Sequence, residues 1–221
     1  MNFFINDTLR YKSVAKNVAQ MFPKHRICIV IDADKNSKLK GTMYKAMMQK
    51  TTTKLVTLHV LKNGGSVVLM SHLGRPKNGP EAKFSLAQIV YKIEEVLHTT
   101  VHFCSECIGE SAKTMSDNLK PGEVLLLENV RFHNEEMVGD SHFSQLLAEL
   151  GNVYINDAFG TAHRAHASTT VIASFFPNDK MFGFLMDGEI KSVDRVLNSQ
   201  EHPVTAIVGG AKVSSKITII E

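Results

Sequence analysis

A chain of 221 residues can hold one large α/β domain and part of another, and its composition, 43% hydrophobic and 21% charged, excludes a disordered polypeptide. The formal net charge of +3, from 25 Lys and Arg against 22 Asp and Glu, is too small for a general nucleic-acid-binding surface. No stretch approaches the ~20 apolar residues of a membrane span, and residues 1–21 lack the apolar run of a signal peptide. We therefore expect a cytoplasmic protein that binds neither nucleic acid nor membrane.

Predicted strands and helices alternate along the chain. Apolar runs rich in β-branched residues predict strands at residues 27–31, 67–70, 100–103, 124–127, 153–155 and 204–208. Helical spacing of apolar residues predicts helices at residues 55–62, 86–97, 110–119, 143–150 and 187–197, with Leu55, Leu58 and Leu61 as the apolar stripe of the first and Ser85 as the cap of the second. Repeated βαβ units of this kind predict an α/β fold with a doubly wound parallel sheet.

Basic side chains follow four of the predicted strands, in short loops that contain Gly or Pro. They are His72 and Arg75, then Arg131, then Arg164 with His163 and His166, and finally Lys212 with Lys216. Ligands of parallel α/β sheets bind outside the carboxyl ends of the strands, so these groups can converge on one anion. The pattern predicts a site for a phosphorylated or carboxylated small molecule, and the alternative is a set of scattered, solvated charges.

Other patterns in the sequence have more than one interpretation. Gly209 and Gly210 precede Lys212 between a predicted strand and helix, which suits a phosphate but also suits an ordinary tight turn. Asp32 and Asp34 end a strand, where carboxylates can act in catalysis or cap the turn.

Two spacings in the sequence are compatible with metal ligands. His163 and His166 lack an evident third ligand, so a role in contacting an anion is favoured over zinc. Cys104 and Cys107 have the spacing of half a zinc site without a second pair, and with Cys28 they make an odd number of cysteines. We expect reduced thiols and no metal site.

The strand-end motifs, taken together and in order, resemble those of the phosphoglycerate kinase family from about Leu55 to Glu221. The motifs are Ser71-His72-Leu73-Gly74-Arg75-Pro76, Leu127-Glu128-Asn129-Val130-Arg131-Phe132, residues 156–168 (NDAFGTAHRAHAS) and Gly209-Gly210-Ala211-Lys212-Val213-Ser214. This resemblance implies transfer of a phosphoryl group between 1,3-bisphosphoglycerate and ADP, giving 3-phosphoglycerate and ATP in glycolysis. Mg²⁺ accompanies the nucleotide, and the expected protein is a monomer whose partners are these small molecules.

The resemblance also implies a domain organisation and roles for particular residues. Residues 1–185 would form the phosphoglycerate-binding domain, 186–202 an interdomain helix and 203–221 the start of a nucleotide-binding domain. The implied substrate-binding residues are Asp32, Asp34, His72, Leu73, Gly74, Arg75, Arg131, His163 and Arg164. Arg164, Lys212 and Lys216 would act in catalysis, and Gly209, Gly210, Lys212 and Lys216 would bind the nucleotide.

The sequence departs from the family pattern in two places. Asp34 stands where the family has an Asn that contacts substrate, and Gln49 or Lys50 stands where the family has an essential Arg. The stretch of residues 33–54 therefore reflects either real divergence or a reading-frame error in the gene sequence. Most of the nucleotide domain is also missing, which implies little or no kinase activity. The alternatives are a non-catalytic phosphate-binding or interaction protein that keeps the basic patch, and a truncated product with no independent role.

Overall fold

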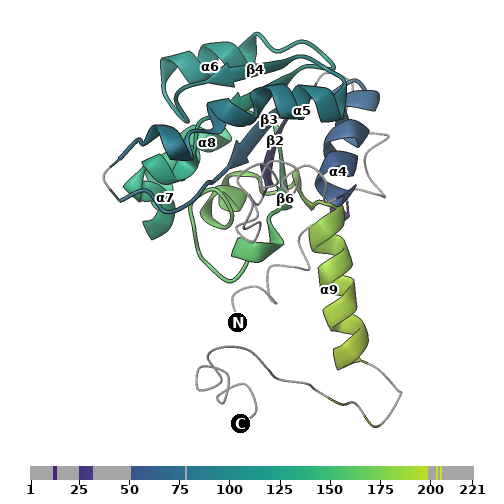
Figure 1. Ribbon diagram of the computed structural model, residues 1–221. Helices are drawn as coiled ribbons and strands as arrows, with labels where there is room; N and C mark the ends of the chain where they lie inside the picture. Colours follow the sequence, from purple (N-terminus) through teal and green to yellow (C-terminus); the bar gives the residue numbers. More distant parts are fainter. Residues whose placement is uncertain are drawn as a thin grey trace. The chain divides into compact units, whose positions relative to one another are not determined.

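The computed structural model describes residues 12–13, 25–31, 51–77, 79–198, 203 and 205. The chain divides into two compact units, residues 1–188 and 189–221. The described part of the first unit contains a parallel sheet of seven strands in the order β1-β7-β6-β2-β3-β5-β4, and helices pack against the sheet (Figure 1). The strands are β1 (Lys12–Ser13), β2 (Arg26–Ile31), β3 (Ser66–Ser71), β4 (Val101–Cys104), β5 (Val124–Leu127), β6 (Val153–Asp157) and β7 (Lys180–Phe182).

Except for α9, which follows β7, the described helices lie in the crossovers that parallel pairing requires. The α-helices are α4 (Thr51–Lys62), α5 (Val90–Leu97), α6 (Glu110–Asp117), α7 (Asn134–Val138), α8 (Ser141–Ala148) and α9 (Phe184–Leu197). Short 3₁₀ turns are η1 (Ala82–Phe84), η2 (Leu86–Ile89), η3 (Val130–Phe132), η4 (Phe159–Thr161) and η5 (Val171–Phe175). None of the helices within the described ranges is long and apolar enough to cross a bilayer.

Alternate residues of the central strand β2 face two separate hydrophobic cores. In β2, Ile27, Ile29 and Ile31 belong to the core that includes residues of α4 and α5, whereas Cys28 and Val30 belong to the core that includes residues of α6 and α8. All five side chains are at most 2% exposed. Because burying a large aliphatic side chain stabilises a fold by roughly 1.5–3 kcal/mol, both faces of this central strand contribute to stability.

At two places in the sheet, the helices or turns that follow two adjacent strands pack on opposite faces of the sheet. Helices α4 and α5, which follow β2 and β3, contribute to the first core, while α8 and η5, which follow β5 and β6, contribute to the second. Since β2 lies beside β6 and β3 lies beside β5, the crossovers diverge at both pairs. Such points are where open α/β sheets bind ligands, at the carboxyl ends of the strands.

The predicted fold class is confirmed, and the predicted strands and helices between residues 27 and 197 are present with shifted ends. The apolar stripe assigned to the first helix is wrong at Leu55, which is 47% exposed, whereas Leu58 and Leu61 pack against the core and Val56 and Val60 are the fully buried apolar positions of α4. The sequence interpretation did not foresee β1, α7 or β7. The expected strand at 204–208 lies outside the described residues except for residue 205, and the proposed domain boundaries stay a prediction.

Candidate anion-binding site

The loop that follows β5 is joined to the loop that follows β3 by one buried amide. The Asn129 side chain accepts hydrogen bonds from the backbone N–H groups of Leu73 (3.2 Å) and Arg131 (3.1 Å), and it donates to the carbonyls of Leu73 (2.8 Å) and Phe84 (2.9 Å). Asn129 is fully buried, so these bonds are shielded from competition with water. The two loops therefore form one unit at adjacent strand ends.

The neighbouring carboxylate of Glu128 has a structural function. It accepts hydrogen bonds from the Ser85 hydroxyl (2.6 Å) and from the backbone N–H groups of Leu86 (2.7 Å) and Asn129 (2.7 Å). Ser85 also caps η2 by accepting from the Ala87 N–H, as its position in the sequence predicted, although the α-helix itself begins later, at Val90. Glu128 thus holds the start of the β3–β4 crossover against the end of β5.

Arg131 extends from η3 toward the loop after β3, and its side chain is largely buried. Its Nη1 atom donates to the Gly74 carbonyl at 3.0 Å. Gly74 has φ +65°, and a Cβ atom there would overlap the Phe84 ring, so only glycine fits this turn without displacement. The Gly74 carbonyl consequently fixes the direction of the guanidinium, a group whose planar array of N–H donors suits phosphate and carboxylate oxygens.

The loop that follows β6 is held by backbone and hydroxyl contacts. Asn156 is fully buried and donates to the Thr169 carbonyl at 2.8 Å. The Arg164 backbone N–H donates to the Thr161 carbonyl (2.9 Å), and the Thr170 hydroxyl donates to the Arg164 carbonyl (3.1 Å). The Arg164 side chain, which is partly exposed, donates from Nε to His163 Nε2 at 3.1 Å, so that nitrogen of His163 acts as an acceptor.

A buried pair of titratable groups lies beneath the two arginines. His166 Nδ1 is 3.7 Å from the Glu136 carboxyl, which accepts bonds from the Ser168 backbone N–H (2.9 Å) and hydroxyl (2.8 Å). Burial raises the pKa of Glu136 to about 7. Burial and the positive charges of Arg131 and Arg164 lower the pKa of His166 to about 4, so the imidazole is neutral at physiological pH.

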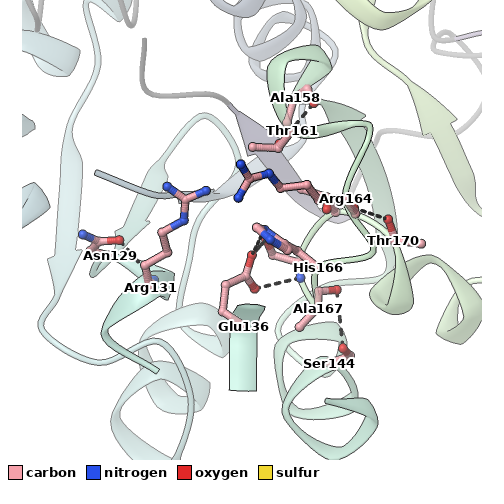
Figure 2. A network of polar contacts seen from close by, with 12 residues as sticks. Asn129, Arg131, Glu136, Ser144, Ala158, Thr161, Arg164, His166, Ala167 and Thr170 are labelled. Carbon is pink, nitrogen blue, oxygen red and sulfur yellow. Dashed lines mark hydrogen bonds and ion pairs between the residues drawn. The ribbon is translucent and has the colours of Figure 1, made fainter. Parts of the chain in front are cut away.

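Figure 2 shows that the guanidinium groups of Arg131 and Arg164 point toward one another from two different loops, with His166 nearby. Both loops follow strands at the switch points of the sheet. Guanidinium groups bind phosphate and carboxylate oxygens through bidentate, charge-assisted hydrogen bonds, and they keep their charge when partly buried. The arrangement can therefore hold a small phosphorylated or carboxylated molecule. We refer to Arg131, Arg164 and His166 as the anion site.

Comparisons with known proteins agree on one family. The family model described as phosphoglycerate kinase matches residues 23–221. The chain belongs to the phosphoglycerate kinase family. It is 48% identical over 163 residues to the chloroplastic phosphoglycerate kinase of Volvox carteri, covering 74% of this chain and 35% of that protein. It is 47% identical over 162 residues to the phosphoglycerate kinase of Chlorobium phaeovibrioides, covering 73% of this chain and 41% of that protein.

Solved structures of phosphoglycerate kinases have the same fold. The enzyme from Coxiella burnetii superimposes with a TM-score of 0.77 at 28% identity, covering 95% of this chain and 51% of that chain. For the enzyme from Pyrococcus horikoshii the TM-score is 0.72 at 27% identity, covering 90% and 49%. The chain thus spans about half the length of the solved relatives and less than half of the curated ones, so the activity of a whole phosphoglycerate kinase is a proposal for this chain.

The structure brings several of the predicted site residues together and places others apart or outside its described range. Arg131, Arg164 and His166 converge, and the exposed His163 contacts Arg164, whereas Arg75 is exposed on its own loop. His72 and Leu73 are buried at the end of β3, with Gly74 beside them. Asp32, Asp34, Gly209, Gly210, Lys212 and Lys216 lie outside the described residues.

Sequence reasoning assigned no function to the buried polar residues that position the loops. Asn129 lies inside one of the family motifs, and its residue type alone indicated a role in positioning the loops. A buried amide at the end of a strand has four hydrogen-bonding positions to satisfy, so it joins neighbouring segments of backbone. Glu136 carried no signal in the sequence. In the part of the chain that the structure describes, no group of three or more His, Cys, Asp or Glu side chains is placed to hold a metal ion.

Proposed function

We propose that this chain binds 3-phosphoglycerate and 1,3-bisphosphoglycerate at the anion site, as the acid-binding part of a phosphoglycerate kinase. The observation that carries the proposal is the convergence of the Arg131 and Arg164 guanidinium groups from the loops after β5 and β6, the two strands that flank the β2–β3 pair (Figure 2). Membership in the phosphoglycerate kinase family supports this choice among phosphorylated acids.

The chemistry of phosphoryl transfer suits the residues in the anion site. Such transfers require the reactants to be aligned and the phosphate charge to be neutralised, and they require little covalent participation by the protein. Arg131 and Arg164 provide two fixed cations for the phosphate and carboxylate oxygens of the acid, and their positions are set by Gly74 and by the loop after β6. The neutral imidazole of His166 can donate one hydrogen bond without adding to the repulsion between the cations.

The proposed reaction is transfer of the acyl phosphate of 1,3-bisphosphoglycerate to ADP, which yields 3-phosphoglycerate and ATP. The proposal assigns the nucleotide to Gly209, Gly210, Lys212 and Lys216, which lie outside the described residues. Mg²⁺, bound with the nucleotide, would neutralise charge on its phosphates. The support for this half of the reaction is the family match, which extends to residue 221.

The test is calorimetric titration of the full 221-residue chain with 3-phosphoglycerate and then with Mg-ADP, followed by a coupled assay for ATP formation from 1,3-bisphosphoglycerate and Mg-ADP. We expect Arg131→Ala and Arg164→Ala each to weaken binding of the acid by about 1.5–3 kcal/mol, because each removes a charge-assisted contact. Lys120→Ala is a control with the same change in charge, since Lys120 is exposed in the turn before β5, at the opposite ends of the strands.

The outcomes separate the two candidate functions. Acid binding with ATP formation supports a kinase, whereas acid binding without turnover supports the alternative of a non-catalytic phosphate-binding protein. Unchanged affinity in both arginine variants would refute the anion site itself.

A further inference from the structure

We propose that Glu136 is a positioning residue of the anion site, which holds the loop carrying Arg164 against helix α7 and whose own protonation adjusts the affinity for anions. This inference rests on the proposed function in one respect, the identity of the ligand. It assigns a role to a carboxyl group that directly contacts neither of the expected reactants.

The first observation is that α7 contacts the Arg164 loop at three successive points. The Glu136 carboxyl accepts hydrogen bonds from the Ser168 backbone N–H (2.9 Å) and from the Ser168 hydroxyl (2.8 Å). The Glu136 backbone carbonyl accepts from the Ala167 N–H at 2.9 Å. At the end of the helix, a Cβ atom on Gly139 would overlap the Ala165 carbonyl. A loop held at residues 165, 167 and 168 has little freedom to move Arg164 away from its neighbour.

The second observation is that α7 follows Arg131, the other arginine of the anion site, closely in the sequence. Arg131 lies in η3, and α7 begins at Asn134, with the Glu136 N–H donating to the His133 carbonyl at 3.3 Å. Glu136 therefore bridges the two loops that supply the two guanidinium groups. Removing its side chain would loosen the spacing between them, and spacing decides whether both can bind one phosphate or carboxylate.

The third observation concerns the charged and titratable groups that face Glu136 from the surrounding elements. They are Arg131 from η3, His166 from the loop after β6, and the buried Cys107 thiol from the loop after β4, whose pKa is raised in part by Glu136. Because His166 is neutral and the thiol keeps its proton, Glu136 is the group of this cluster that changes charge near neutral pH. When it ionises, a negative charge lies beneath the two cations and opposes a bound anion.

The experiment compares three variants of the full chain with the wild type, using 3-phosphoglycerate and inorganic sulfate as separate probes between pH 6 and 8. Sulfate is included because its charge is constant in this range, whereas a phosphate ester titrates near pH 6. Glu136→Ala removes both bonds to Ser168. Glu136→Gln keeps the shape and removes the charge change. Glu135→Gln is the matched control, because Glu135 is an exposed neighbour on the same helix.

We expect sulfate affinity of the wild type to fall on the order of fivefold as the pH rises from 6 to 8, the effect of one charge several ångströms away in a partly solvated site. Glu136→Gln should abolish this pH dependence, and Glu135→Gln should keep it. Glu136→Ala should weaken binding of both probes about tenfold at pH 6, because the loop loses two buried hydrogen bonds. Glu136→Gln carrying the wild-type pH profile would overturn the proposal, even if Glu136→Ala fails to fold.

A readout without any ligand separates this inference from the proposed function. The imidazole resonances of His166, followed by NMR during a pH titration, should shift as Glu136 ionises in the wild type and in Glu135→Gln, and should lose that step in Glu136→Gln. If the wild type binds neither probe but shows the step, the proposed function fails while the Glu136–His166 coupling stands. If the wild type binds 3-phosphoglycerate and the step is absent, the coupling fails alone.

Discussion

The buried Glu136–His166 pair leads to a prediction about folding stability that requires no ligand. Glu136 has its pKa raised from 4.5 to about 7, and His166 has its pKa lowered from 6.5 to about 4. Between pH 4.5 and 7 the native state holds a proton on Glu136 that the unfolded chain has released, so this group stabilises the fold at low pH and loses its contribution as the pH rises. Between pH 4 and 6.5 the unfolded chain protonates His166 while the native state does not, so this group stabilises the fold at high pH.

The two contributions oppose each other and have similar sizes. Each shift of about 2.5 pKa units corresponds to about 3 kcal/mol across its window. Relative to the wild type, Glu136→Gln should therefore gain about 3 kcal/mol of unfolding free energy as the pH rises from 4.5 to 7. His166→Gln should lose a similar amount between pH 4 and 6.5. In the wild type the two slopes largely cancel over their shared range.

Urea denaturation at a series of pH values measures these differences directly. Circular dichroism is the suitable signal because the chain contains no tryptophan. Comparing each variant with the wild type at the same pH removes the contributions of all other titrating groups. Slopes of opposite sign in the two variants, with neither slope in the double variant, are the expected result. Parallel curves for the wild type and both single variants would refute the assignment of protons to this pair.

Three further predictions concern other buried features. Gly74→Ala should lower the free energy of unfolding by about 1–3 kcal/mol and weaken 3-phosphoglycerate binding, because the φ of +65° and the adjacent Phe84 ring leave no room for a Cβ atom. Urea denaturation would measure the first effect and calorimetry the second. Asp157→Ala should cost about 1–2 kcal/mol in thermal or urea unfolding, because its carboxylate accepts from backbone N–H groups at the start of α9 at 2.8 and 3.2 Å. Cys28 and Cys107 are buried with raised pKa values, so a disulfide reagent at pH 8 should label them only after denaturant is added, and rapid native labelling would contradict this burial.

The central part of the fold was predictable because its physical cause is local. Strands buried on both faces require continuous apolar runs, and Ile27–Ile31 and Val67–Met70 are such runs. The orientation of α4 was only partly predictable, since its leucines and its valines both recur at helical spacing. Leu58 and Leu61 pack against the core as predicted, but packing against the sheet buries Val56 and Val60 fully and leaves Leu55 exposed. Strand β7 has three residues, and its pairing with β6 and β1 defines it more than its own composition does.

The same distinction applies to the anion site. Arg131 and Arg164 were identifiable because cations at the ends of parallel strands share one edge of the sheet whatever the details of packing. Glu136 was not identifiable, because Glu135 and Glu136 are equivalent in sequence and differ only in which one faces Ser168, 32 residues further along the chain. Local pattern therefore located the charges of the proposed anion site, and tertiary structure was needed to find the groups that hold them.

The register of the central strand has a consequence for the order of folding. Cys28 in β2 pairs with Val68 in β3, but on its other side it pairs with Tyr154 in β6, which is far more distant in sequence. Closing the longer loop costs more chain entropy and slows the step that depends on it. Strands β2 to β5 can associate before β6 is added, and Arg164 reaches Arg131 only when β6 has paired. During refolding or synthesis, we therefore expect the ability to bind an anion to appear after most of the parallel sheet has formed, so that ligand binding reports the insertion of one late strand.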